Sequence, residues 1–125
     1  MTENEIAKIV VDLCIKIHKI LGPGLLESVY EAALVYELKK LRIPVEQQVG
    51  VPVEYDDVHL DIGFRADVII ENKFLVELKS VETLLAVHKK QLLTYLKLKK
   101  FKLGLLANFN VELMKDGITR IANGL

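Results

Sequence analysis

The chain has 125 residues, of which 51% are hydrophobic and 27% are charged, and its formal net charge is zero. This composition is typical of a globular protein and excludes an intrinsically disordered chain. The length allows a sizeable core without disulfides or a structural metal, so we expect one domain over residues 1–125.

No membrane or secretory segment is evident in the sequence. No apolar stretch reaches the roughly 18–20 residues of a membrane span, and the first residues lack the apolar core of a signal peptide. Cys14 is the single cysteine, so an internal disulfide cannot form. We therefore expect a cytoplasmic location, with Cys14 as a small buried apolar residue on a helix.

Two helices are predicted at the start of the chain. Thr2-Glu3-Asn4-Glu5 is a capping-box pattern, and apolar residues at helical spacing follow it over roughly residues 3–20. Leu21-Gly22-Pro23-Gly24 ends this helix, and a second helical pattern covers roughly residues 25–41. Pro44 excludes a longer helix, because the residue before a proline avoids the helical conformation. The apolar residues of the second pattern are Leu26, Val29, Ala33, Leu34 and Leu38.

The apolar period changes to two after the second helix. Val45 to Tyr55 is predicted as a strand with alternating faces, and Pro52 favours an edge position in the sheet. Asp56-Asp57 is the predicted turn into the next strand.

The C-terminal part is predicted to hold a helix, a strand and a hairpin. Residues 83–99 are amphipathic, Leu103 to Phe109 is a short buried strand, and Val111 to Ala122 is a hairpin turning at Asp116-Gly117. The inward residues expected on the helix are Leu84, Leu85, Val87, Leu92, Tyr95 and Leu96, with Leu98 as a further candidate. The order α-α-β-β-β-α-β-β predicts an α/β (α+β) fold in which helices flank a mixed sheet.

Charged residues interrupt two apolar strands in the middle of the chain. The first strand carries Asp67, and the second, after the polar turn Glu71-Asn72-Lys73, carries Glu77 and Lys79. Residues two apart share a strand face, so Glu77 and Lys79 point the same way. Mg²⁺ or Mn²⁺ held by Asp67 and Glu77 would compensate the cost of burying the carboxylates. Lys79 would then position or deprotonate a water, or stabilise charge on a phosphate. A surface ion pair contributing about 0–1 kcal/mol is the alternative interpretation.

Acidic and basic side chains are unevenly distributed along the chain. Residues 45–80 hold eight acidic and three basic side chains, whereas residues 81–125 hold three acidic and eight basic ones. An acidic metal site beside a basic rim suits cleavage of a polyanion, although a lysine-rich helix is also a common solvated surface.

The chain resembles a nuclease superfamily over nearly its whole length. The element order, with Asp67 followed by Glu77-x-Lys79, resembles the restriction-endonuclease-like αβββαβ core of the PD-(D/E)XK nuclease superfamily. The segment Gly24-Leu25-Leu26-Glu27-Ser28-Val29-Tyr30 is similar to the signature of the GxxExxY family within it. Ala66 stands where the superfamily name has a proline, at a position that varies widely among its members.

The resemblance implies a Mg²⁺-dependent nuclease that hydrolyses phosphodiester bonds, with DNA as the favoured substrate. It implies Asp67, Glu77 and Glu27 as metal ligands, which together with Lys79 make up the catalytic set. Glu27 has an alternative role, because a carboxylate in a first helical turn stabilises the helix N-terminus.

A second motif lies on the helix over residues 83–99. Gln91-Leu92-Leu93-Thr94-Tyr95 resembles the QxxxY motif of nuclease domains in bacterial recombination helicases, which implies that Gln91 and Tyr95 contact a phosphate or fix Lys79. Both also fit a structural role on an apolar helix face. His18, His59 and His88 are predicted to be structural.

A catalytically silent nuclease-fold module, acting in protein or nucleic-acid interaction, is the alternative function, because a fold does not dictate an activity. Small size and neutral charge favour it, whereas Asp67, Glu77 and Lys79 favour the nuclease. Val49-Gly50-Val51 on the edge strand is a candidate surface for homo-oligomerisation.

Overall fold

The computed structural model of the chain describes residues 1–125, except for the side chain of Ile62. Its elements in order are α1 (Glu3–Leu21), α2 (Glu27–Lys40), β1 (Val45–Tyr55), β2 (Val58–Ile70), β3 (Phe74–Lys79), α3 (Ala86–Lys99), β4 (Leu103–Asn108), the 3-10 helix η1 (Met114–Gly117) and β5 (Ile118–Ala122). This order contains the predicted αβββαβ core.

The strands form one mixed sheet in the order β1-β2-β3-β4-β5. β3 and β4 are parallel, and every other neighbouring pair is antiparallel. The parallel pair needs a crossover, which α3 provides. The predicted mixed sheet flanked by helices is confirmed, and β1 lies at its edge as Pro52 indicated.

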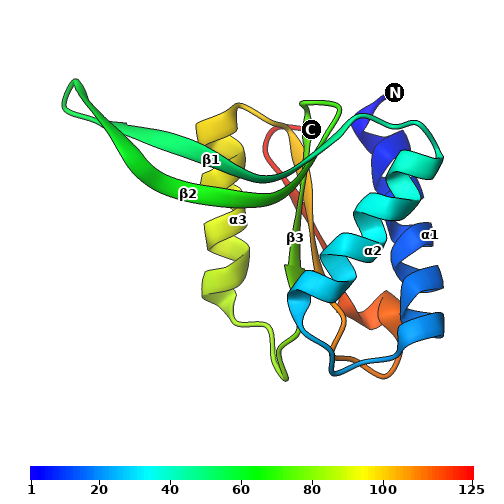
Figure 1. Cartoon of the computed structure of the whole chain (residues 1–125). Helices are drawn as coiled ribbons and strands as arrows, with labels where there is room; N and C mark the ends of the chain where they lie inside the picture. The colour runs from blue at the N-terminus through cyan, green and yellow to red at the C-terminus, as the bar shows by residue number, and fades with distance from the viewer.

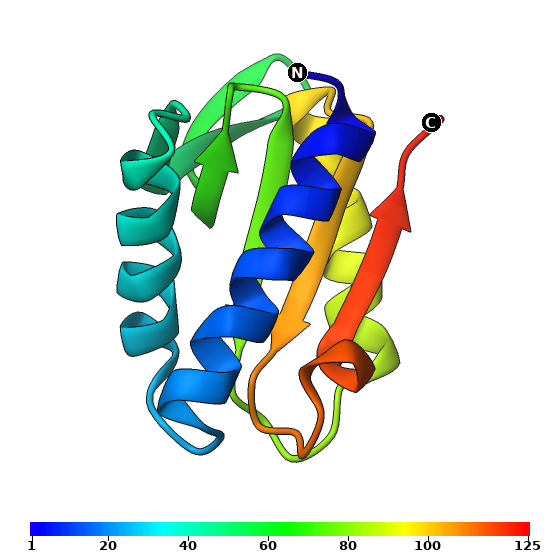
Figure 2. The same cartoon turned by 90° about the vertical axis from the view of Figure 1, so that its right-hand side faces the viewer.

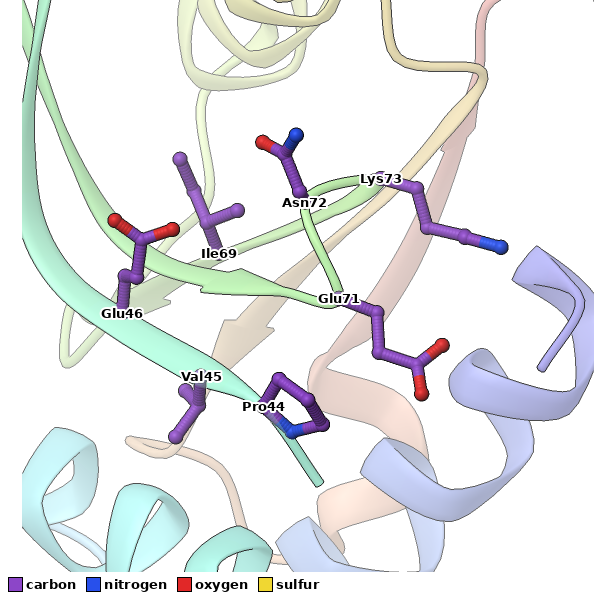
Figure 3. Close-up of a pocket in the computed structure, with 7 residues that line it drawn as sticks. All are labelled: Pro44, Val45, Glu46, Ile69, Glu71, Asn72 and Lys73. Atoms are coloured by element: carbon purple, nitrogen blue, oxygen red, sulfur yellow. The ribbon is translucent and has the colours of Figure 1, made fainter.

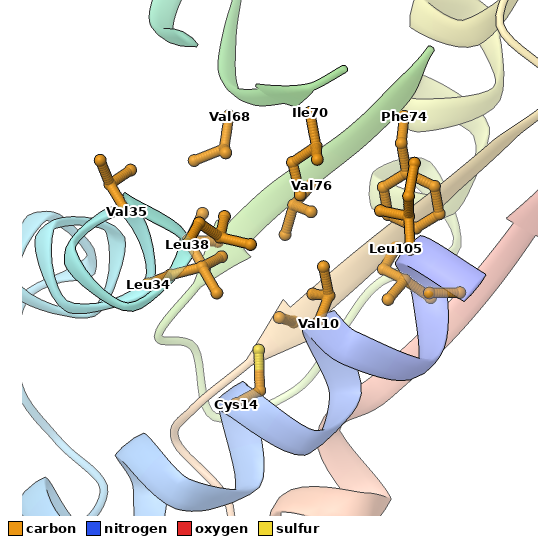
Figure 4. Packing of buried hydrophobic residues seen from close by; sticks show 14 of the residues in the cluster. Val10, Cys14, Leu34, Val35, Leu38, Val68, Ile70, Phe74, Val76 and Leu105 are labelled. Atoms are coloured by element: carbon orange, nitrogen blue, oxygen red, sulfur yellow. The ribbon is translucent and has the colours of Figure 1, made fainter. Parts of the chain in front are cut away.

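Helices cover both faces of the sheet, with α1 and α2 on one face and α3 on the other (Figure 2). On the first face, side chains from α1 and α2 interlock with those of β2, β3 and β4 (Figure 4). Val10, Leu34, Val68 and Phe74 are fully buried there, and so is Cys14, as predicted. Burial raises the pKa of the Cys14 thiol to about 12, so the thiol stays neutral.

The predicted capping box at the start of α1 is present. The Glu5 backbone N–H donates to Thr2 Oγ1 at 3.2 Å, and the Thr2 backbone N–H donates to Glu5 Oε1 at 3.1 Å. These bonds satisfy N–H groups that have no partner inside the helix. No helix in the described part of the chain is long and apolar enough to cross a membrane.

The prediction of a terminal hairpin over Val111 to Ala122 was wrong. Residues 114–117 form a 3-10 turn, and β5 pairs with β4 instead of with the segment before it. The backbone of Val111 is engaged elsewhere, because its carbonyl oxygen lies 2.8 Å from His18 Nε2. Gly117 passes so close to the Asn108 carbonyl that no Cβ fits there, which brings the chain back alongside β4.

Several apolar residues of the predicted helical patterns are exposed, and the inward direction predicted for some residues of α3 was wrong. Leu26 and Val29 of the second helical pattern are 75% and 40% exposed. On α3, Leu92 and Leu96 are buried as expected, but Val87 is 60% exposed. The remaining exposed members of the predicted inward set are Leu85 and Leu98. α2 and α3 begin later than expected, at Glu27 and Ala86, so Leu26 and Leu85 precede their helices.

The β1–β2 hairpin curves away from β3 toward the α3 side of the sheet (Figure 1). β2 pairs with β3 only from Val68 opposite Val76 to Ile70 opposite Phe74. Before Val68 in β2 and after Val76 in β3, the two strands no longer pair, and the space between them forms a fork. Asp67 lies on β2 at the mouth of this fork, and Glu77 lies across from it on β3.

Candidate active site

Two carboxylates take the place of the sheet hydrogen bonds at the fork. The Asp67 backbone N–H donates to Glu77 Oε2 at 2.8 Å, and the Leu78 backbone N–H donates to Asp67 Oδ2 at 2.9 Å. Each acid therefore accepts a main-chain hydrogen bond from the strand of the other. The two predicted acidic residues are thus in one place, fixed by the backbone of both strands.

Glu77 is a buried acid, with 7% of its surface exposed. Residues of β3 alternate between the sheet faces, and Leu75 packs with the α3-side cluster, so Glu77 and Lys79 share that side. Burial, followed by the charge of Asp67, raises the pKa of Glu77 to about 8, against the opposing effect of Lys79. Without a cation, Glu77 is therefore mainly protonated at neutral pH.

α3 brings Tyr95 toward the carboxylate pair. Burial, and after it the charges of Glu77 and Asp67, raises the pKa of the Tyr95 hydroxyl, which stays a hydrogen-bond donor. Its ring stacks on Phe64 of β2 with the ring centroids 3.5 Å apart. Gln91 is exposed and precedes Tyr95 by four positions, which places both on one side of the helix.

Glu27 lies beside the C-terminal end of β3. Its Oε1 accepts a hydrogen bond from the Ser80 backbone N–H at 3.3 Å, and Ser80 Oγ donates to the Leu25 carbonyl at 2.7 Å. The Tyr30 hydroxyl holds the preceding loop, because it donates to the Gly22 carbonyl at 2.6 Å and accepts from the Leu25 N–H at 3.0 Å. Glu27 therefore fastens the start of α2 to the end of the strand that carries Glu77, and Tyr30 holds the loop before α2 in place.

Residues 4–121 match the family model described as the PD-(D/E)XK nuclease superfamily. The chain belongs to this superfamily. No match was found among curated proteins or among solved structures. Membership of the PD-(D/E)XK nuclease superfamily agrees with the observed sheet and helices, and it indicates nuclease activity on nucleic acid.

The assignment of Asp67, Glu77 and Lys79 as the acidic and basic residues of the superfamily name stays a prediction. Asp67 and Glu77 are in contact, and Lys79 is half-buried at the last position of β3. Among the described residues, no three His, Cys, Asp or Glu side chains form a group that could hold a metal ion. The role of Glu27 as a third ligand stays a prediction.

The sequence interpretation missed Glu31 and Gln48. Glu31 of α2 is 9% exposed, and its Oε1 accepts from Gln48 Nε2 at 2.7 Å. Gln48 Nε2 also lies 3.4 Å from Asp67 Oδ1, so these residues extend the site to α2. The available signal was the spacing of Glu31, four positions after Glu27 and hence on the same side of the helix.

Asn108 was missed as well, although it interrupts the apolar run of β4 and is 3% exposed. Its side chain holds Val81 by two hydrogen bonds, accepting from the N–H at 3.0 Å and donating to the carbonyl at 2.9 Å. Asn108 is also the β4 partner of Lys79. It therefore fixes the course of the chain directly after Lys79.

His18 and His88 contact backbone atoms, in agreement with the structural role predicted for them. His18 Nε2 lies 2.8 Å from the Val111 carbonyl, and His88 Nδ1 accepts from the Leu85 N–H at 3.0 Å. His59 is exposed on the β1–β2 hairpin.

A surface groove lies at the other end of the β2–β3 pairing (Figure 3). Its lining residues are Pro44, Val45, Glu46, Ile69, Glu71, Asn72 and Lys73. The Lys73 ammonium donates to the Met1 carbonyl at 2.8 Å, and Glu71 contacts the Met1 ammonium at 3.3 Å. Because these charges are paired with Met1 and the fork residues do not line it, we assign the groove no part in the site.

Proposed function

We propose that the protein hydrolyses phosphodiester bonds of nucleic acid, with DNA as the favoured substrate, through Mg²⁺ or Mn²⁺ bound by Asp67 and Glu77. The observation that carries this proposal is the carboxylate pair at the fork, fixed by two main-chain hydrogen bonds and accompanied by Lys79. We also propose that the protein belongs to the GxxExxY family within the superfamily.

The donor set fits a hard divalent cation. Asp67 and Glu77 supply oxygen ligands, and the pKa of Glu77 is raised because burial and Asp67 disfavour its charged form. A divalent cation removes that penalty, and nucleases of this superfamily typically use divalent metals. When bound, the cation offsets negative charge on the phosphate and makes water more acidic.

The residues around the pair have distinct proposed roles. Lys79, on the same side of β3 as Glu77, stabilises the negative charge that develops on the phosphate or orients the attacking water. Glu27 is the proposed third oxygen donor, close to the end of β3. Gln91 and Tyr95 are proposed to donate hydrogen bonds to phosphate oxygens, which the protonated Tyr95 hydroxyl supports.

Three further properties of the protein stay predictions from its sequence. These are one domain over residues 1–125, a cytoplasmic location, and self-association through the β1 edge near Val49-Gly50-Val51.

A cleavage assay on DNA and RNA substrates, with Mg²⁺ or Mn²⁺ and with a chelator, tests the proposed function. We expect metal-dependent cleavage by the parent protein and loss of at least about 10²-fold in Asp67→Asn. Asp61→Asn is the matched control, because Asp61 lies on the same strand with an exposed side chain and pairs only with His59 among the described ion pairs. Absence of metal-dependent cleavage on every substrate would favour the catalytically silent module.

A further inference from the structure

Gln48 connects Asp67 to a buried carboxylate on α2. Its Nε2 group donates to Glu31 Oε1 at 2.7 Å and reaches Asp67 Oδ1 at 3.4 Å. The other oxygen of Asp67, Oδ2, accepts from the Leu78 N–H at 2.9 Å. Gln48 and Leu78 therefore approach the two oxygens of Asp67 from different strands.

Glu31 anchors the same end of the Gln48 amide that faces Asp67. A carboxylate only accepts hydrogen bonds, so Gln48 must turn its NH₂ group toward Glu31. That same NH₂ group carries the second hydrogen that faces Asp67. Gln47 Nε2 donates to the remaining oxygen of Glu31 at 3.0 Å and so helps to fix its buried side chain.

The backbone of Gln48 is shaped for this contact. Neighbouring residues of a regular strand point to opposite faces, yet Gln47 and Gln48 both reach Glu31. Gln48 has φ of 49°, in the left-handed region that non-glycine residues seldom adopt, and this breaks the alternation. Arg65 Nη1 donates to the Gln48 carbonyl at 2.9 Å and holds that conformation from β2. Unfavourable backbone conformations persist where surrounding contacts enforce them, and they concentrate at functional sites.

We propose that Gln48, oriented by Glu31, is a positioning residue that fixes the Asp67 carboxylate for cation binding. The inference rests on the proposed function, because Asp67 is the proposed ligand. Hydrogen-bond partners of metal-binding carboxylates hold them in the geometry that the ion needs, and their loss typically costs about 10–100-fold in metal affinity or activity.

Calorimetric titration of the whole protein with Mn²⁺ alone tests this role. Gln48→Met keeps the length of the side chain and removes the amide, and we expect it to weaken Mn²⁺ binding about 10–100-fold. Gln47→Met is the matched control, because Gln47 contacts Glu31 and has no contact with Asp67 among the described hydrogen bonds. Because Gln47 acts on Asp67 only through Glu31, its loss of Mn²⁺ affinity should be clearly smaller than that of Gln48→Met. Melting temperatures of all variants show whether each one is folded.

The outcomes separate this inference from the proposed function. Parent-like Mn²⁺ affinity in folded Gln48→Met, or equal losses in both glutamine variants, would overturn the positioning role and leave the proposed function standing. No Mn²⁺ binding by the parent protein would overturn both.

Glu31→Gln provides a second test if Gln48→Met does not fold. A carboxamide at position 31 lacks the negative charge of Glu31 and can present its own NH₂ group, so it no longer anchors the Gln48 Nε2 group beside Asp67. We expect weaker Mn²⁺ binding in folded Glu31→Gln, and unchanged affinity would overturn the proposal.

Discussion

Asp67 Oδ2 and Glu77 Oε2 each accept a backbone N–H at the point where β2 and β3 part. Buried main-chain donors need partners, so these two oxygens serve the fold whether or not a cation is present. Asp67 and Glu77 would also be the residues that hold a cation, and the cation would offset their negative charge. The same pair therefore ends the β2–β3 pairing and supplies the proposed oxygen ligands.

Lys79 has two possible roles, one in the chemical step and one in the stability of the fold, and a single substitution distinguishes them. If it acts on the phosphate or the attacking water, Lys79→Ala should lower cleavage by about 10²-fold or more and leave Mn²⁺ affinity nearly unchanged. Lys102→Ala is the control, because Lys102 is exposed just before β4. Activity, Mn²⁺ affinity and melting temperature are measured on both variants. A lower melting temperature with unchanged cleavage would show that Lys79 is only the counter-ion of the acidic pair.

Glu77 makes the stability of the metal-free protein depend on pH. Burial and Asp67 raise its pKa from 4.5 to about 8 in the folded protein, so between these values the folded state holds a proton that the unfolded state has lost. The contribution of protonated Glu77 to the free energy of unfolding is fully present below about pH 4.5 and is lost as pH rises through about 8. Denaturant unfolding across this range should therefore show a decline that is absent in Glu77→Gln. An equal decline in both proteins would contradict the assignment.

The acidic pair could be predicted from the sequence, because burying a charge inside an apolar strand costs free energy unless something compensates it. Glu77 and Lys79 are two residues apart and therefore lie on the same face of the strand. The contact partners of Glu31, Gln48 and Asn108 could not be predicted. Glu31 and Gln48 join α2 to β1, and their contact depends on a left-handed backbone at Gln48 that no local pattern indicated. Asn108 acts on Val81, a segment 27 residues away.

At the scale of elements, the order of helices and strands could be predicted because breakers and changes of period separate them. Leu21-Gly22-Pro23-Gly24 divides α1 from α2, and the period of two begins at β1. The terminal segment could not be predicted, because its course depends on His18 of α1 and on the close approach of Gly117 to Asn108. Exposed apolar residues such as Val87 misled the assignment of the inner face of α3.

The packing of α3 against β4 offers a prediction at this scale. A Cβ on Gly104 would lie 2.8 Å from the Leu75 carbonyl oxygen and 3.2 Å from Leu96 Cδ2. Gly104→Ala should therefore destabilise the protein by about 1–3 kcal/mol, because backbone and helix must shift. Gly50→Ala is the control, since nothing lies within 4 Å of its Cβ position. Denaturant unfolding of both variants checks this, and equal stabilities would contradict the close packing of α3 that brings Tyr95 to the fork.

Over the whole molecule the net charge is zero, but the charges are unevenly distributed, with acidic residues at the fork and basic residues on α3. Asp67 and Glu77 lie at the fork, whereas Lys89 and Lys90 are exposed on α3 next to Gln91. The exposed lysines of α3 would favour the approach of a polyanion, whose phosphates dominate the affinity of nucleic-acid binding. This arrangement supports a nucleic-acid substrate and leaves its sequence preference to groups other than the acidic pair.

The proposed function requires that the fork between β2 and β3 binds a divalent cation. Crystals of the protein grown with Mn²⁺ near pH 8, where Glu77 can release its proton, would test it through anomalous scattering. We expect an anomalous peak bonded to carboxylate oxygens of both Asp67 and Glu77. A Mn²⁺-saturated crystal with no peak at these two side chains, or with Mn²⁺ bound only elsewhere on the protein, would contradict it.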